Sequence, residues 1–424
     1  MDIYIHKDTV GLSQHLVCKS DTREIRKVKD LPDTPLVYGT KQFEEISELF
    51  SISLPSFPPP PQVRALKSAL NGQDIEKIPW ALAMDSSVFL AAVKELGNFL
   101  MDNFSQLDLS YYQTHFLKTV EVFDAFQPAK IDPVAWKVWG EANDATQVIR
   151  SFKPDQLGFA EEVVYSRNTK TGRVKTISGP KILLLPKANR SLLASRFGKN
   201  GKIMVVDYRA LEPRVVLAVK ELAALSSSTK DSFSPSLGYL PLAPLPTDGT
   251  DLYAQISEKL GIKGVPRDVM KEVVISLLYG ASYETISNSL HSVRDVDGLV
   301  EIVNDLFGVQ ELRSRLRVEN EINERQYVLS HFGRRIDTRE AEDYMLVNYF
   351  AQSTAVDVAL YGFRSLLENL QGSTTIIPLF FAHDSLVLDV DAKEESSLSE
   401  LCKVATTNIP LFPGVTFPLK VSEF

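Results

Sequence analysis

The segment FFAHDSLVLDV at residues 380–390 places a His-Asp pair between two apolar runs of strand character. The run IIPLFFA comes before the pair and LVLDV comes after it. Short apolar runs that are bounded by turn residues predict buried strands, and Asp is a favoured turn residue. We therefore expect a β-hairpin with His383 and Asp384 at its turn. A plain turn and a functional carboxylate are both open interpretations.

A second carboxylate follows another strand of this kind. KIMVVDY (202–208) predicts a buried strand running into Asp207, and the segment 210–225 has helical period. Asp207 could cap that helix, because Asp before a helix accepts backbone N–H bonds. Glu212 flanks the same strand-to-helix transition. The pattern fits either a helix cap or a pair of site carboxylates.

The helix expected at 266–280 carries cations at an unfavourable end. Pro266 suits the first helical position, and Gly280 suits the stop. Cations near a helix N-terminus are electrostatically disfavoured unless they hold something anionic, such as a polyphosphate. An amphipathic surface helix is the alternative. The residues that recur every fourth position, and so share one face, are Arg267, Lys271, Ile275 and Tyr279.

Composition indicates a globular protein large enough for two or three domains, with 424 residues, 44% hydrophobic and 24% charged. No apolar run reaches the ~18 residues that a membrane span needs, and MDIYIHKDTV lacks signal-peptide character. The two cysteines, Cys18 and Cys402, lie far apart, and the histidines form no cluster. We expect a reducing compartment, no disulfide framework and no zinc site.

Charge is unevenly distributed in this chain of net charge −8. Between Val163 and Lys202 there are ten Lys or Arg residues and no Asp or Glu. Such a segment predicts a local electropositive surface for a polyanion, with a solvated loop as the alternative.

The remaining segments suggest how the chain is organised. Pro58–Pro61 predicts a stiff connector, and the Ser- and Pro-rich segment 226–250 predicts a surface loop. Strands and helices that mix without strict alternation predict an α+β architecture. Further helices are expected at 133–152, 251–261, 296–330 (one or two) and 339–370, and a last short strand at FPLKV.

Together these segments resemble the motifs of the family A DNA polymerases, the bacterial polymerase I type shared with many phages. DYRALEPR (207–214) is similar to that family's D-Y-S-x-x-E-x-R. The helix at 267–280 has the spacing R-x-x-x-K-x-x-x-(F/Y)-x-x-x-Y-G, and HDS (383–385) stands where the family has H-D-E. The resemblance covers about residues 110–424 in the family's order, and its further elements are FQPAKID (126–132), TKTGRV (169–174), FGRR (332–335) and NYFAQSTAVDV (348–358).

The resemblance implies a right-hand polymerase fold with palm, fingers and a reduced thumb. Residues 1–105 would be a small N-terminal domain of unknown role, either an exonuclease remnant or a partner-docking region. Residues 106–424 would be the polymerase domain. Its expected parts are a palm at about 106–132, 175–255 and 336–424, a reduced thumb at about 133–172 and fingers at about 256–335.

The resemblance also implies the site and its ligands. Two Mg²⁺ ions, with Mn²⁺ as a substitute, would bind the catalytic residues Asp207 and Asp384 and the carbonyl of Tyr208. The other expected partners are deoxynucleoside triphosphates and primer-template DNA. The residues implied for the nucleotide are Glu212, Arg267, Lys271, Ile275 and Tyr279, and those for DNA are Arg173, Arg334, Asn348, Gln352 and His383.

Three positions depart from the family pattern. Ser385 replaces a Glu, Ile275 an aromatic residue, and Tyr253 a His. The related single-subunit RNA polymerases also have H-D-S, which makes RNA synthesis an alternative. Glu212 favours DNA synthesis, because a bulky carboxylate there would clash with a ribose 2′-hydroxyl.

A catalytically silent relative that only binds nucleic acid is another alternative. Proofreading is expected to be absent, because the residues before the polymerase region are too few for an intact 3′–5′ exonuclease. A separate processivity or exonuclease partner would then serve long synthesis. The expected location is the cytoplasm of a bacterium or phage-infected host, with no membrane association.

Overall fold

The computed structural model describes residues 2–9, 12–19, 25–28, 87, 110–167, 169–227, 251–259, 265–289, 296–405 and 408–424. The chain divides into two compact units, Met1–Leu117 and Lys118–Phe424. The proline connector, the expected boundary after residue 105 and most of the 226–250 segment lie outside the described residues. In the first unit, three strands form an antiparallel sheet in the order β1 (Asp2–Thr9), β2 (Leu12–Lys19) and β3 (Ile25–Val28).

The second unit is built on a four-stranded sheet in the order β11-β6-β10-β9. Every neighbouring pair in it is antiparallel. The hairpin expected around His383 and Asp384 is present, because this pair separates β9 from β10. The strand expected at 202–208 is also present. The strand bounds are β6 (Gly201–Tyr208), β9 (Ile376–Ala382), β10 (Ser385–Asp391) and β11 (Leu419–Glu423).

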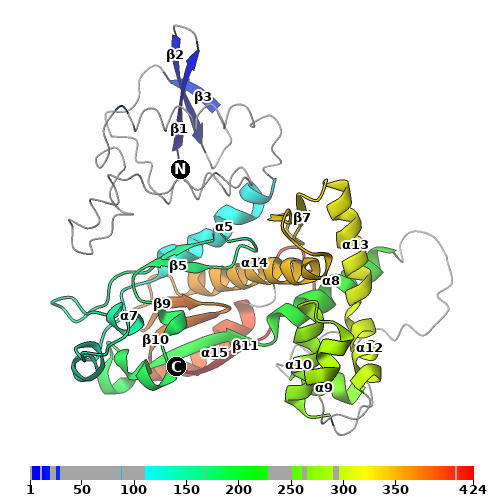
Figure 1. Ribbon diagram of the computed structural model, residues 1–424. Coiled ribbons are helices and arrows are strands. Elements are labelled where there is room, and N and C mark those ends of the chain that lie inside the picture. The colour runs from blue at the N-terminus through cyan, green and yellow to red at the C-terminus, as the bar shows by residue number, and fades with distance from the viewer. Residues whose placement is uncertain are drawn as a thin grey trace. The chain divides into compact units, whose positions relative to one another are not determined.

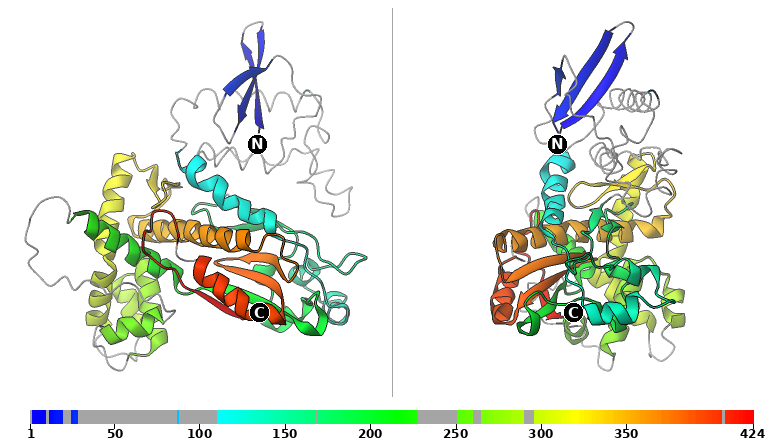
Figure 2. Two further views of the ribbon diagram at one scale, coloured as in Figure 1. Left: turned by 180° about the vertical axis from the view of Figure 1, so that it is seen from behind. Right: turned by 90° about the vertical axis from the view of Figure 1, so that its left-hand side faces the viewer.

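Two helices pack beside this sheet, α14 (Leu346–Asn369) and α15 (Glu395–Ala405) (Figures 1 and 2). The helix expected at 339–370 is present over residues 346–369, but it is not amphipathic. Polar residues of α14, such as Thr354 and Asp357, are as completely buried as Val358. The reason is that α8, α13 and α15 also pack against α14, so no broad face is left to solvent.

The helices between Leu211 and Ile322 gather at one side of the sheet, and α8 leads from the sheet into this group (Figure 1). The segment 296–330 contains two helices, which part at Gly308, a residue with a φ of 62°. Pro266 lies just before its helix as the N-cap instead of in the first turn. The bounds are α8 (Leu211–Ser227), α9 (Leu252–Lys259), α10 (Arg267–Leu278), α11 (Tyr283–Ser289), α12 (Val296–Phe307) and α13 (Val309–Ile322).

The single helix expected at 133–152 is wrong. Asp132 caps a first helical stretch by accepting hydrogen bonds from the backbone N–H groups of Val134 and Ala135, at 2.9 and 2.8 Å. That stretch ends at Gly140, and Thr146 caps a new one. The turn-forming Asn143 and Asp144 lie between the two. The pieces are α6 (Pro133–Ala135), the π-helical turn η5 (Trp136–Gly140) and α7 (Gln147–Arg150).

Short elements complete the fold. The strands β4 (Val164–Ser166) and β5 (Lys175–Ser178) pair, as do β7 (Tyr327–Leu329) and β8 (Arg335–Asp337). The mixture of helices and strands confirms the expected α+β class. None of the helices that the structure describes combines the length and apolar character needed to cross a membrane. The short helices are α5 (Leu117–Val120) and the single turns η3 (Tyr112–Phe116), η4 (Glu121–Ala125), η6 (Ile182–Leu184), η7 (Lys187–Leu192), η8 (Gly198–Asn200), η9 (Asp343–Met345) and η10 (Ala392–Glu394).

Candidate active site

Sheet register brings the two predicted carboxylates together. Asp207 pairs with Ser385 across β6 and β10, so Asp384, one residue earlier, lies at the end of β6. The Tyr208 N–H donates a hydrogen bond to the Asp384 carbonyl oxygen at 3.3 Å. His383 takes a φ of 59°, which turns the chain sharply between the two strands. The hairpin turn therefore presents Asp384 beside Asp207.

The pKa values of these carboxyl groups report a site of excess negative charge. Burial, together with the nearby Asp384 carboxylate, raises the pKa of Asp207 to about 6. Burial likewise raises the pKa of Asp384. Lys420, on β11, opposes the rise at Asp207. Two carboxylates held this way favour a cation or a proton between them.

Tyr208 fixes the end of β6 on α14. The centroid of its ring lies 5.0 Å from the ring centroid of Phe363, and the residue is almost completely buried. Its hydroxyl lies against Gly362, where a Cβ would come within 1.9 Å of the oxygen. Sequence interpretation missed Gly362, although a glycine inside a predicted helix is a recognised sign of close packing. The Tyr208 carbonyl as a metal ligand stays a prediction.

An open pocket of about 530 Å³ lies at this end of the sheet. The end of β6, the start of α8 and one face of α10 all contribute to its walls. Most of the predicted metal and nucleotide residues therefore share one space. The predicted residues that line it are Asp207, Tyr208, Glu212, Arg267, Lys271, Ile275 and Asp384.

The two predicted helix cations differ in their surroundings. The Arg267 Nε lies 2.5 Å from Asp251 Oδ2, and its guanidinium lies 5.4 Å from the Tyr253 ring centroid. Asp251 therefore already offsets the charge of Arg267, which was expected to need an anionic ligand. Lys271 is exposed and has neither a hydrogen bond nor an ion pair with any described residue. Lys271 is the cation of α10 that remains available to a ligand.

Glu212 is held in a network of polar side chains. Its carboxylate accepts a hydrogen bond from the Tyr279 hydroxyl and lies 3.8 Å from Arg173 Nη2. The Gln352 side chain also hydrogen-bonds to Tyr279, and Thr171 Oγ1 donates to Gln352 Oε1 at 3.4 Å. Burial raises the pKa of Glu212, and Arg173 opposes this rise. These contacts fix the orientation of the Glu212 side chain.

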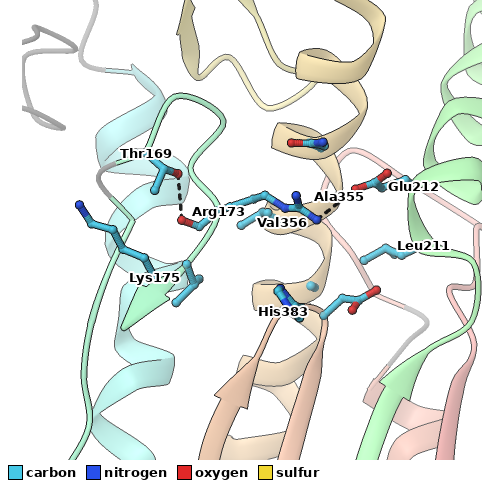
Figure 3. Close-up of a pocket in the computed structure, with 12 residues that line it drawn as sticks. Thr169, Arg173, Lys175, Leu211, Glu212, Ala355, Val356 and His383 are labelled. Atoms are coloured by element: carbon cyan, nitrogen blue, oxygen red, sulfur yellow. Dashed lines mark hydrogen bonds and ion pairs between the residues drawn. The ribbon is translucent and has the colours of Figure 1, made fainter. Parts of the chain in front are cut away.

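A second pocket, of about 270 Å³, adjoins the first (Figure 3). It brings together three predicted DNA-binding residues from distant parts of the chain: Arg173 from the β4–β5 loop, Gln352 from α14 and His383 from the hairpin turn. Figure 3 shows Arg173 reaching from its loop toward Glu212. Glu212 and Asp384 line both pockets. The carboxylates of Glu212 and Asp384 therefore lie where the two pockets meet.

Two buried arginines hold the loop that presents Arg173. Arg167 is completely buried; its Nη2 lies 2.6 Å from Asp357 Oδ1, and its Nε donates to the Gly172 carbonyl oxygen at 3.2 Å. Arg334 is 6% exposed, and its Nη2 donates to the Thr169 carbonyl oxygen at 3.2 Å. The expectation that Arg334 contacts DNA stays a prediction, because its described contacts are within the protein.

The other predictions fare unevenly. Asn348 lines neither pocket, and its buried Oδ1 has no hydrogen-bond partner among the residues that the structure describes. In the basic segment, the Arg167 side chain is completely buried, and the partly buried Arg196 is held by other protein groups: its Nη2 donates to the Pro128 carbonyl oxygen at 2.5 Å, and its Nε lies 3.6 Å from Asp389 Oδ2. The surface charge is therefore smaller than the sequence count suggested.

Several lining residues escaped sequence interpretation. Asp251, which pairs with Arg267, and Lys420 both line the larger pocket. The sequence pattern of β11 predicts a strand but does not predict that it pairs with β6. No local feature of the sequence therefore indicates that Lys420 lies beside Asp207. Among the described residues, no group of three or more His, Cys, Asp or Glu side chains gathers as a metal site.

Comparisons with known proteins find a similar fold among solved structures. Neither protein-family models nor curated proteins match the chain. Among solved structures, the chain is similar to the polymerase domain of Pol1 from M. smegmatis, described in complex with DNA primer-template and dNTP. The TM-score is 0.54 at 16% identity, over 78% of this chain and 73% of that one. The chain therefore has an α+β fold like that of a bacterial polymerase I polymerase domain.

Proposed function

We propose that this chain is a template-directed DNA polymerase that adds deoxynucleotides to a primer 3′-hydroxyl. The observation that carries the proposal is the pocket in which Asp207 and Asp384 meet beneath the Lys271 face of α10. Carboxylates and a cationic wall in one space match the needs of a reaction at a polyphosphate. The likeness to a polymerase domain solved with primer-template and dNTP supports it.

The donor set fits Mg²⁺, or Mn²⁺ in its place. Asp207 and Asp384 offer hard oxygen ligands, and the excess negative charge that raises their pKa values favours a cation. Among the described residues, no third His, Cys, Asp or Glu side chain joins Asp207 and Asp384 as a possible metal ligand, so the Tyr208 carbonyl, water and phosphate oxygens would complete the coordination. When bound, the ions would stabilise charge on the attacking and leaving oxygens.

The nucleotide would lie between α10 and the sheet. Lys271 would bind its phosphates, joined by Arg267 if that side chain exchanges Asp251 for phosphate. The primer 3′-hydroxyl would give its proton to solvent as its oxygen forms a bond to the α-phosphorus, and the bond from that phosphorus to the bridging oxygen would break to release pyrophosphate. Tyr279 and Ile275 would contact the base pair and the sugar.

Glu212 would select the sugar. Its hydrogen bond from Tyr279 and its proximity to Arg173 limit the positions that the carboxylate can take. A fixed carboxylate beside the sugar would clash with a 2′-hydroxyl, whereas a mobile one could move aside. This arrangement favours deoxynucleotides over ribonucleotides.

Primer-template DNA would lie along the second pocket. Arg173, Gln352 and His383 project into it from three elements, and their donors suit phosphate and minor-groove contacts that depend little on sequence. The sheet would then be the palm, the group α9–α13 the fingers, and residues 133–172 a reduced thumb.

Primer extension with Mg²⁺ tests the proposal. The full chain is incubated with a labelled primer on four templates that differ in the next base, with each deoxynucleotide or ribonucleotide supplied singly. We expect incorporation of the complementary deoxynucleotide in every case. DNA binding without any incorporation would establish the silent relative, and a preference for ribonucleotides would establish the RNA polymerase.

A further inference from the structure

Lys420 lies beside the carboxylate pair on the side away from Asp384. In the strand order β11-β6-β10, it pairs with Asp207 across β6 and β11, while Ser385 pairs with Asp207 on the other side. Directly paired residues project from the same face of a sheet. Lys420 accordingly lines the larger pocket together with Asp207 and Lys271.

The Lys420 side chain is exposed and uncommitted. No hydrogen bond or ion pair joins it to any described residue, although it is close enough to Asp207 to favour the charged carboxylate. The effect of Lys420 on Asp207 acts through space, and no direct ion pair between these two described residues ties up the lysine side chain. Its ammonium group instead remains free to contact a ligand in the pocket.

The charge of the proposed substrate calls for such a group. A nucleoside triphosphate brings several negative charges into a space that already holds Asp207 and Asp384. Of the two cations on α10, Arg267 is paired with Asp251, which leaves Lys271. Lys271 and Lys420 come from different elements, α10 and β11, and line the same pocket.

We propose that Lys420 binds the triphosphate of the incoming nucleotide, and the pyrophosphate after transfer, from the side of the sheet. This inference rests on the proposed polymerase function. Lys420 gives up no proton and forms no covalent bond in this role; it holds the leaving group while the α-phosphorus bond to it breaks. Because Lys420 is paired directly with Asp207 across β11 and β6, a lysine elsewhere on β11 would not take this place in the pocket.

Single-nucleotide incorporation by Lys420→Met, Lys420→Gln and Lys420→Arg tests the role. A charge-assisted hydrogen bond to phosphate is worth about tenfold in affinity, so KM for the nucleotide should rise about tenfold in the Met and Gln variants. The inhibition constant for added pyrophosphate should rise similarly. kcat and the Kd for primer-template should stay within about twofold, and Lys420→Arg should recover most of the loss.

Lys403→Met is the matched control, because Lys403 is an exposed lysine on α15 whose ammonium pairs with Glu400. It should leave KM unchanged. Calorimetric titration of a non-hydrolysable deoxynucleoside triphosphate into the complex with a dideoxy-terminated primer measures binding without turnover.

If the wild type incorporates nucleotide but Lys420→Met and Lys420→Gln keep its KM, the inference is overturned while the polymerase function stands. A loss confined to kcat or to DNA affinity also overturns it. A wild-type chain that binds primer-template and incorporates nothing overturns the polymerase function itself.

Discussion

At the scale of single residues, the site holds two carboxylates together against their own repulsion. The β6–β10 register places them side by side, and their partial burial reduces the contact with water that would screen them. A chain that keeps such a pair does so at the expense of its own stability. Lys420 offsets part of this repulsion at Asp207, and a bound cation or a proton would relieve it further.

Replacing Asp207 with Asn should stabilise the metal-free protein at neutral pH. The folded-state pKa of about 6 exceeds the ordinary 3.8, so Asp207 favours folding below about pH 4, and this contribution is lost as pH rises through 6. Thermal unfolding in EDTA should therefore show a higher Tm for Asp207→Asn at pH 7.5 and a smaller difference at pH 5. A lower Tm at pH 7.5 would show that Asp207 is stabilised by contacts that this account omits.

Glu212→Ala should admit ribonucleotides. Removing the carboxylate removes the clash with the 2′-hydroxyl, and pocket fit of this size is worth at least about tenfold in discrimination. The ratio of kcat/KM for a deoxynucleotide to that for the matching ribonucleotide measures it. Ile275→Tyr serves as the comparison: it should improve acceptance of dideoxynucleotides instead. An unchanged ribo-to-deoxy ratio in Glu212→Ala would remove Glu212 from sugar selection.

At the scale of elements, the β4–β5 loop depends on α14. The ion pair between Arg167 and Asp357 is fully buried, and Arg167 also donates to Thr119 Oγ1 at 2.6 Å. Gly172, at a φ of 71°, fits closely against both Arg334 and Arg167. The loop that presents Arg173 is thereby held in place by buried contacts within the protein.

Arg167→Met should lower the free energy of unfolding by about 3–5 kcal/mol, because it leaves the Asp357 charge buried without its partner. The double variant Arg167→Met, Asp357→Leu should recover much of that loss, since apolar residues of similar volume can replace a buried pair. Urea unfolding measures both. If the ion pair also positions Arg173, the stable double variant should still bind primer-template more weakly than the wild type, and equal affinity would limit the pair to a structural role.

Sequence patterns predict some of these elements and not others. The strands that carry Asp207 and Asp384 are continuous apolar runs with turn residues at their ends, so local pattern sufficed. The residues of α10 that line the larger pocket recur at every fourth position, so the helical period predicts that they share a face. Residues 133–152 look helical only on average, because the Asn143-Asp144 turn and the Thr146 cap outweigh the helix formers around them. The pairing of β11 with β6 joins residues that are far apart in the sequence. Local pattern therefore could not predict that Lys420 lies beside Asp207.

At the scale of the whole molecule, the stretch 133–167 offers little to grip a duplex. Its longest helical stretch is eight residues, the α6–η5 run, and the described elements that follow, α7 and the short strand β4, do not complete a helical hairpin. Exposed cations in the basic segment, among them Lys181, Lys187 and Lys199, would supply most contacts with the DNA backbone.

The isolated chain should therefore be distributive and strongly salt-sensitive. Primer extension with an excess of trap DNA should give products only a few nucleotides long per encounter. Raising the salt concentration should lower affinity for primer-template steeply, in proportion to the number of phosphates neutralised. Products of hundreds of nucleotides in the presence of the trap would place the grip on DNA elsewhere in the chain.

The most direct test of the central claim is single-nucleotide incorporation by Asp384→Asn. The matched control is Asp391→Asn at the far end of the same strand, where the carboxylate caps a turn by accepting from the Lys393 N–H. Both variants should bind primer-template like the wild type, and the control should keep its rate. Asp384→Asn should lose at least about a hundredfold in kcat, because one carboxylate of the proposed metal site is gone. A rate for Asp384→Asn within a few-fold of the wild type would contradict the assignment of the Asp207–Asp384 pocket as the polymerase active site.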